Sequence, residues 1–181
     1  MTGMARTDRG FSITELMLTV AVAATVMGLA VPVLSDLSDS VKLNEAARVV
    51  ERELQDARMK AVSSNRAVRV RMNCPAAQYI RRVEVLGTSA DTATNRCLPT
   101  AYPYPPDDDL MTRPNYDGPV RVLPNNASVS TATIEFRPDG TAYTVSSGVP
   151  TVMSSPVTIT VTRKTSYRMV TVNGVGKIQL Q

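Results

Sequence analysis

Residues 9–34 have the sequence RGFSITELMLTVAVAATVMGLAVPVL, and no charged side chain occurs from Leu16 to Leu34. This apolar run of about 19 residues is close to the ~20 that a transmembrane helix needs. Glu15 stands immediately before the run, where a carboxylate close to hydrocarbon is costly unless it has a partner. The stretch therefore predicts a membrane-spanning helix with an acidic residue at its start that needs an explanation.

The charges on the two sides of this run predict its orientation. The segment before it is short and basic, and the segment after it has two aspartates before its first lysine; these residues are Arg6, Asp8, Arg9, Asp36, Asp39 and Lys42. Because positively charged flanks stay in the cytoplasm, we expect the leader to remain there and the rest of the chain to be exported.

Two interpretations of this segment rest on its residues alone. A cleaved signal peptide has about 7–15 apolar residues before its A-x-A site. Ala21–Ala24 resembles such a site, but only Leu16–Val20 precede it after Glu15. In an uncleaved signal anchor, Ser12–Glu15 would fit the S-x-x-E capping box that ties down the start of a helix.

The helical period continues beyond residue 34. Apolar residues recur at steps of three and four, and charged residues fill the other faces; the apolar positions are Leu43, Ala46, Ala47, Val50, Leu54, Ala57 and Ala61. We therefore expect residues 35–63 to be the amphipathic second half of one helix that starts at Phe11. A separate helix after a break near residues 35–40 is the alternative.

After Asn65 the period changes to two. In Val68–Met72, apolar residues alternate with Arg69 and Arg71, which predicts a strand with one solvated face. Seven more strands are expected, at Gln78–Leu86, Val120–Leu123, Thr133–Arg137, Ala142–Ser146, Val157–Arg163, Tyr167–Val172 and Lys177–Leu180. Turns with glycine are expected at Pro138–Gly140 and, as a hairpin, at Asn173–Gly174. About eight short strands after one long helix indicate an α+β fold, with an antiparallel sheet packed on the helix.

The composition excludes several kinds of chemistry. The chain has no histidine, which removes the commonest general base and the commonest metal ligand. Its two cysteines, Cys74 and Cys97, are too few for the usual structural zinc site. A disulfide in an oxidising compartment is expected, worth roughly 3 kcal/mol by loop closure, with two free thiols as the alternative. No metal, cofactor or enzymatic activity is expected.

Residues 99–119 depart from the strand pattern. Six prolines in this stretch lack the backbone N–H that a strand donates to its neighbour, so we interpret it as an exposed loop. They are Pro99, Pro103, Pro105, Pro106, Pro114 and Pro119. Asp107–Asp109 lack the alternate spacing of an EF-hand calcium loop, and we interpret them as a solvated charge run.

The segment around Gly10 resembles the type III signal of the type IV pilin superfamily. In that signal a short basic leader ends in glycine, a phenylalanine follows, and glutamate is the fifth residue of the mature chain. The resemblance implies that a prepilin peptidase cleaves between Gly10 and Phe11 and methylates the new amine of Phe11. Residues 1–10 would then be a leader peptide, and residues 11–34 a transmembrane and filament-core helix. It also implies that Glu15 pairs with the terminal amine of a neighbouring subunit, which answers its need for a partner.

The C-terminal half resembles the GspH/FimT family of minor pilins and pseudopilins. The resemblance rests on Ile134–Ala142, Val157–Thr162 and Arg168–Leu180. Some members bind DNA through a basic Gly-Arg-x-Arg element, whereas the matching stretch here has Lys177 as its single basic residue. Contact with DNA or another ligand is expected, if at all, at Lys177 or on the strand face that carries Arg69 and Arg71. Arg66, Arg81 and Arg82 could extend that basic face, although a solvated outer face is the preferred interpretation.

Two functional hypotheses follow from these resemblances. The first is a structural minor subunit of a type IV pilus or a type II secretion pseudopilus. Its partners would be other subunits, the prepilin peptidase and the inner membrane, with residues 64–181 forming a periplasmic β-rich domain. The second is a DNA-uptake or adhesive minor pilin that binds its ligand through that domain.

Overall fold

The chain is organised as two compact units that share one helix. The computed structural model describes residues 12–104 and 117–181, apart from the side chains of residues 29–36. Unit 1 ends at Asp39, and unit 2 is Ser40–Gln181. The helix α1 (Ile13–Ser64) has residues in both units. The predicted helix is confirmed from Ile13 onward, and the alternative of two helices separated near residues 35–40 is wrong.

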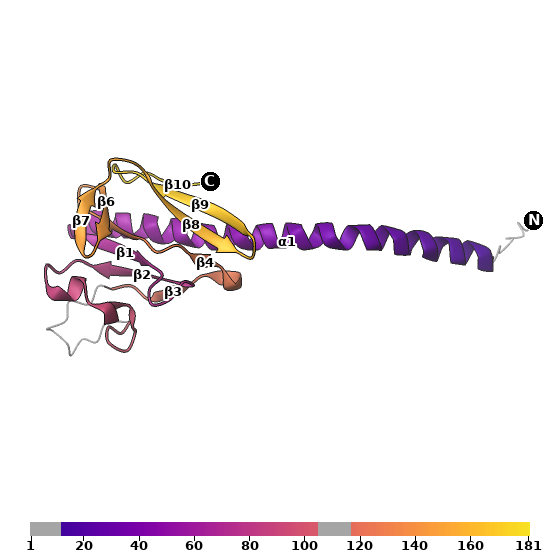
Figure 1. Ribbon diagram of the computed structural model, residues 1–181, viewed down its shortest axis with the longest axis horizontal. Helices are drawn as coiled ribbons and strands as arrows, with labels where there is room; N and C mark the ends of the chain where they lie inside the picture. Colours follow the sequence, from indigo (N-terminus) through magenta and orange to yellow (C-terminus); the bar gives the residue numbers. More distant parts are fainter. Residues whose placement is uncertain (1–11, 105–116) are drawn as a thin grey trace, which may run out of the picture. The chain divides into compact units, whose positions relative to one another are not determined.

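The described residues of unit 2 form ten strands in two antiparallel sheets (Figure 1). The six-stranded sheet has the order β3-β2-β1-β5-β6-β7, with β1 (Val68–Met72), β2 (Tyr79–Glu84), β3 (Val120–Val122), β5 (Thr133–Phe136), β6 (Ala142–Ser146) and β7 (Val149–Val152). The four-stranded sheet has the order β10-β9-β8-β4, with β4 (Ser128–Val129), β8 (Val157–Arg163), β9 (Ser166–Val172) and β10 (Ile178–Leu180). Three short 3-10 turns lie in the connections: η1 (Ser89–Asp91) and η2 (Thr94–Cys97) between β2 and β3, and η3 (Pro124–Asn126) between β3 and β4.

The α+β fold class is confirmed, with two strands more than expected. Each of the eight predicted strands is present, with ends that differ by at most two residues. The additional β4 has only two residues, which is too short to show a period. The additional β7 contains Pro150, which removes a ladder donor and marks an edge strand. Its position at the edge of the six-stranded sheet agrees with that rule.

The core of unit 2 lies between one face of α1 and the two sheets. The predicted apolar positions of the helix, from Leu43 to Ala61, are all buried in it. Among them, Val50, Leu54 and the four alanines have no exposed area. Strands contribute Val70, Phe136 and further side chains to the same cluster. Full burial of such a side chain is worth about 1.5–3 kcal/mol, so this face fixes α1 in unit 2.

A single arginine on α1 connects the turns of both sheets. Arg58 donates from Nε to the carbonyl of Gly140, in the β5–β6 turn, at 3.1 Å, and from Nη2 to the carbonyl of Val175, in the β9–β10 turn, at 3.2 Å. Gly176 has a φ of +74°, and a Cβ there would collide with the Gly140 carbonyl oxygen. The two glycine turns therefore approach each other so closely that no side chain fits between them.

The turn between β9 and β10 is longer than Asn173–Gly174. The predicted hairpin is confirmed, because β9 and β10 are consecutive strands that pair antiparallel, but its turn extends to Lys177. The backbone N–H of Lys177 donates to the Asn173 side chain at 2.8 Å, and that of Gly176 donates to the Asn173 carbonyl at 2.9 Å. The left-handed glycine is Gly176 rather than Gly174. The asparagine side chain thus closes a longer turn than the sequence suggested.

Candidate functional site: the exposed helix and the outer arginine layer

The described side chains of α1 in unit 1 expose large apolar surfaces. Every side chain from Ser12 to Gly28 is exposed, and the larger apolar ones retain more than half of their surface; these are Ile13, Leu16, Met17, Leu18, Val20, Val22, Val26 and Met27. Exposed apolar area on this scale marks a surface that contacts protein or lipid. The first part of α1 is therefore the candidate assembly surface.

Glu15 lies in the first turn of α1, where a carboxylate is favoured by the helix dipole. The predicted capping box is not formed in its side-chain part: the Ser12 hydroxyl lies 2.7 Å from that of Thr14, and only the Ser12 carbonyl accepts a helix bond, from Leu16 N. Within residues 12–104 and 117–181, Glu15 has no hydrogen-bonding or ionic partner. Its carboxylate is thus available to a group from another chain.

The structure does not test the predicted processing site or the predicted membrane span. Gly10 and Phe11 lie outside the described residues, as do Asp107–Asp109. Among the described residues, no helix is both long and apolar enough to cross a membrane. The span predicted over residues 11–34 stays a prediction.

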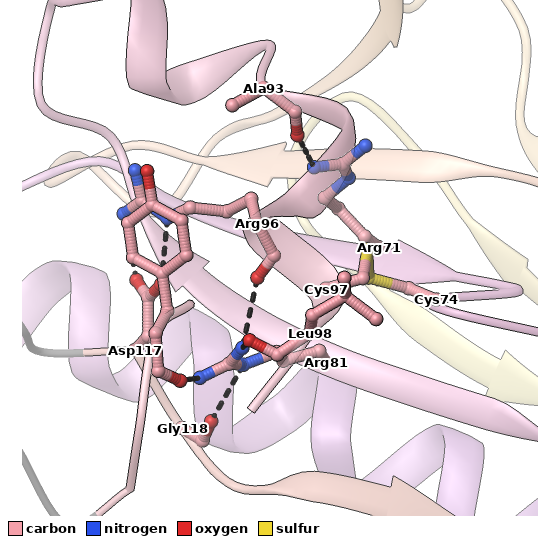
Figure 2. Close-up of a disulfide and its surroundings, with 10 residues drawn as sticks. Arg71, Cys74, Arg81, Ala93, Arg96, Cys97, Leu98, Asp117 and Gly118 are labelled. Carbon is pink, nitrogen blue, oxygen red and sulfur yellow. Dashed lines mark hydrogen bonds and ion pairs between the residues drawn. A yellow bond between two sulfur atoms is a disulfide. The ribbon is translucent and has the colours of Figure 1, made fainter. Parts of the chain in front are cut away.

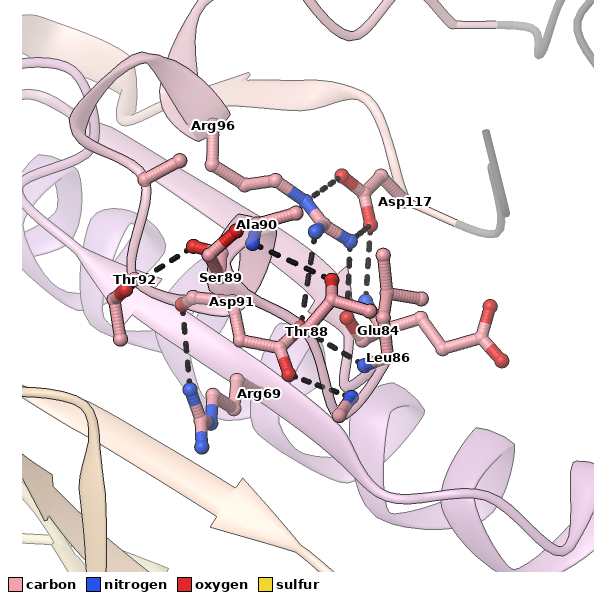
Figure 3. Close-up of polar contacts among 12 residues, drawn as sticks. Arg69, Glu84, Leu86, Thr88, Ser89, Ala90, Asp91, Thr92, Arg96 and Asp117 are labelled. Carbon is pink, nitrogen blue, oxygen red and sulfur yellow. Dashed lines mark hydrogen bonds and ion pairs between the residues drawn. The ribbon is translucent and has the colours of Figure 1, made fainter. Parts of the chain in front are cut away.

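On unit 2, the face of β1 and β2 opposite to the core carries a layer of arginines. Arg69 has three partners: Glu135 at 2.8 Å from Nε, the Asp91 carbonyl at 3.3 Å from Nη1, and the Gly148 carbonyl at 3.2 Å from Nη2. Figure 3 shows the side chain beneath the η1 turn. With 5% of its surface exposed, Arg69 is a structural ion-pair residue.

The most deeply buried part of this layer is the pair Arg96–Asp117 (Figure 3). Arg96 donates from Nε and Nη2 to the two carboxylate oxygens at 2.7 and 2.8 Å, and neither side chain is exposed. Burial alone would lower the pKa of Arg96, but its hydrogen bonds to Asp117 and the charge of that carboxylate outweigh burial and raise the pKa. Asp117 also accepts from the backbone N–H of Glu84, so the pair connects β2 to the chain before β3.

Arg81 and the disulfide hold the segment that covers this layer (Figure 2). Arg81 donates to the carbonyls of Gly118, Arg96, Leu98 and Tyr102, and burial lowers its pKa. The predicted disulfide between Cys74 and Cys97 is present, with 5.2 Å between the two Cα atoms. The disulfide connects the end of η2 to the segment that follows β1. Residues 85–98 therefore lie over Arg69, Arg71 and Arg81.

This covering segment corrects the expectation of a solvated outer face. Arg69 and Arg71 do share one side of β1, but Arg69 and Arg81 are 5% and 1% exposed. Glu135, the ion-pair partner of Arg69, is 66 residues away along the chain, and the Gly118 carbonyl that accepts from Arg81 is 37 residues away, so nothing local in the sequence indicates either partner. Arg66, the most exposed member of the expected basic face, pairs with Glu84 at 2.7 Å. An alternating strand predicts the face of a side chain but not what covers that face.

Lys177 lies apart from the arginine layer. Its side chain is exposed in the β9–β10 turn, where it lines a hollow with Arg58, Met59 and Val175. Arg69 and Arg71 line a different pocket. The structure therefore does not bring the three predicted contact residues together. In the described part of the chain, no cluster of acidic or cysteine side chains is arranged to hold a metal ion.

The described residues form one N-terminal helix whose first part is exposed and apolar and whose second part packs on antiparallel sheets. This arrangement defines the class of pilin-like proteins. Within this class the chain belongs to the GspH family, because the sequence model described as "Type II transport protein GspH" matches residues 46–176. The recognition of this family from the sequence is confirmed.

Two solved structures are similar to this chain. Both are of the type IV minor pilin FimU of Pseudomonas aeruginosa strain PAO1, in different crystal forms, at 16% sequence identity. One covers 80% of this chain and 92% of its own with a TM-score of 0.49, and the other 77% and 92% with a TM-score of 0.46. No curated protein matches the sequence.

Proposed function

We propose that this protein is a minor pilin or pseudopilin, a structural subunit that enters a type IV pilus or type II secretion pseudopilus through the first part of α1. The observation that carries the proposal is the exposure of apolar side chains from Ile13 to Met27. In a filament, helices of other subunits would cover these side chains. Membership of the GspH family supports the same role.

Before assembly, the same helix would anchor the protein in the inner membrane. The basic residues of the leader support a cytoplasmic N-terminus and a periplasmic unit 2. Prepilin peptidase would cleave between Gly10 and Phe11 and methylate Phe11. Mass spectrometry of protein from the native membrane would then find a chain that begins at N-methylated Phe11. An intact Met1 in cells with active peptidase would contradict this step.

Glu15 would act during assembly by pairing with the Phe11 amine of another subunit. Its lack of a partner among the described residues supports this role, since a charge that enters an apolar filament core needs compensation. Glutamine at this position keeps the size and the hydrogen-bonding capacity but removes the charge.

The test compares wild type, Glu15→Gln and Glu51→Gln at equal membrane levels. Glu51 is the matched control because it undergoes the same chemical change on the part of α1 that belongs to unit 2. We expect Glu15→Gln to be inserted and cleaved normally but to be depleted from sheared filaments, while Glu51→Gln is incorporated like wild type. Equal incorporation of all three proteins would exclude the intersubunit pairing.

A DNA-uptake or adhesive role is the second candidate. The exposed side chain of Lys177 favours it, whereas the partners of Arg69 and Arg81 leave few cations free on the strand face. DNA retention by the protein that falls steeply with salt concentration would support this role. Deletion of the gene, scored for twitching and for secretion, would distinguish a pilus from a secretion system.

A further inference from the structure

Arg71 differs from the other arginines of the outer layer in having most of its donors unused. The only hydrogen bond of its side chain in the described part of the chain runs from Nη1 to the Ala93 carbonyl, at 3.2 Å (Figure 2). Arg81, on the neighbouring strand, donates to four carbonyls, and Arg69 uses all three of its nitrogens. Because a guanidinium has five N–H donors, Arg71 can bind a further acceptor without losing the contact to Ala93.

The unused donors of Arg71 lie beside a pocket of about 340 Å³ on the outer face of the six-stranded sheet. Arg69 and Arg71 line it from β1, Thr133 from β5, and Ser147 from the β6–β7 turn. Hydroxyl groups of Thr133 and Ser147 are therefore available at the same place. A volume of this size admits one small organic acid or one acidic side chain.

The walls of the pocket are fixed by contacts that do not involve a ligand. Arg69 is held by Glu135 and by the carbonyls of Asp91 and Gly148. Gly148 has a φ of +83°, and a Cβ there would collide with the Thr92 side chain, so the β6–β7 turn packs closely on the chain after η1. The donors around the pocket are thus positioned before anything binds, which lowers the entropic cost of binding.

The charge around the pocket favours a negative charge in it. Arg69 pairs with Glu135, which also pairs with Arg137, and Arg96 pairs with Asp117 and Asp91, whereas Arg71 lines the pocket with no ion pair among the described residues. Burial, and then the charges of Arg69 and Arg96, lower the pKa of Arg71, so an anion placed beside it would relieve an unfavourable charge.

We propose that the pocket between Arg69 and Arg71 is a binding site for a carboxylate group. Planar guanidinium donors match the two oxygens of a carboxylate, and one lining arginine without an ion pair suits a monoanion better than a phosphate dianion. A nucleic-acid strand would need cations along a track, whereas this pocket offers one uncompensated arginine. This site is separate from the exposed helix, and its solution test does not depend on the proposed function.

The test uses the full chain in a neutral detergent, with ¹⁵N-labelled arginine. The Nε–H resonances are followed while sodium acetate replaces sodium chloride at constant ionic strength. We expect saturable shifts at Arg71 and Arg69, with no saturable shift at Arg52, which is exposed on α1. Inorganic phosphate above neutral pH should bind more weakly than acetate. Shifts in acetate that do not saturate, or tighter binding of phosphate, would overturn the proposal.

Variants test whether Arg71 supplies the binding. Arg71→Gln should weaken acetate binding about ten- to a hundred-fold, which is the range for loss of a charge-assisted hydrogen bond. Arg71→Lys keeps the charge without the planar donors, so its affinity for acetate should lie between those of wild type and Arg71→Gln. Arg52→Gln should bind acetate like wild type. Unchanged Arg81 and Arg96 resonances show that the layer is still folded. Equal binding by Arg71→Gln and wild type would contradict the assignment.

A second arm identifies the source of the carboxylate, and this arm alone rests on the proposed function. Phenylglyoxal modification of Arg71 is measured by peptide mapping in sheared filaments and in the detergent-solubilised chain. Protection in filaments without added acid assigns the carboxylate to a neighbouring subunit. Protection that appears only with added acetate or glucuronate assigns it to a free organic acid. Modification of Arg71 to the same extent under all these conditions would overturn the site.

Discussion

The two faces of β1 are both covered, but by opposite means. Val68, Val70 and Met72 point into the core, where apolar side chains from α1 and both sheets surround them. Arg69 and Arg71 point the other way, where Glu135 and a set of backbone carbonyls receive their donors. The core face is therefore stabilised by area removed from water, whereas the outer face depends on each charge having a particular partner. Single substitutions should reveal this difference.

The largest loss of stability is expected on the charged face. Arg96→Met leaves Asp117 buried without its bidentate partner, which costs about 3–5 kcal/mol. Urea unfolding of the full chain in a mild detergent measures the change. The double variant Arg96→Met/Asp117→Leu should recover a large part of the loss, because no unpaired charge is then buried. A loss below about 1 kcal/mol in the single variant would contradict the proposed dependence on specific partners.

On the apolar face, Leu54→Ala should cost about 3–4 kcal/mol, since it removes a completely buried side chain and leaves a cavity. Met59 lies on the same helix with 62% of its surface exposed, and Met59→Ala should change stability by less than about 0.5 kcal/mol. The same unfolding experiment compares them. Equal losses of stability in the two variants would contradict the burial of Leu54 and the exposure of Met59 in the structure.

The disulfide is expected to act on the charged face alone. Replacing both Cys74 and Cys97 by serine should cost about 3 kcal/mol, because the bond closes a loop with a sequence separation of 23. Hydrogen exchange should accelerate in residues 85–98 more than in the core strands. In the exported wild-type protein, alkylation without reductant should label neither cysteine. Labelling of both would show that the bond does not form in the cell.

The alternation in β1 explains how far the sequence could predict these faces. Periods of 3.6 and 2 placed α1 and eight strands correctly, because burial against a large apolar core depends on pattern rather than on any one partner. The partners of Arg69 and Arg96 are side chains far away in sequence, and nothing local indicates them. Arg71, predicted as a contact residue, lines a pocket whose other walls come from three further segments. The sequence therefore predicts correctly which side chains of β1 point to the outer face, but wrongly that this face is solvated.

The smallest effect is expected at the surface turn before β6. Asp139 accepts from the backbone N–H and the hydroxyl of Thr141, and these bonds hold its pKa below the ordinary 3.8. A lowered folded-state pKa means that the stabilisation is present above 3.8 and is lost as pH falls through the folded value. The stability difference between wild type and Asp139→Ala should therefore be larger at about pH 6 than at about pH 2. A difference that does not change with pH would contradict this.

The contact of Arg58 with two turns has a consequence for insertions and deletions. Most surface turns accept added residues, because their ends can move apart without disturbing the core. Here the Gly140 and Val175 carbonyls are bound by one side chain, and Gly176 leaves no space beside Gly140. An added residue in either turn would pull its carbonyl away from Arg58 and displace the other. The lengths of the two turns are thus linked, and homologous chains should differ in length elsewhere before they differ at these two places.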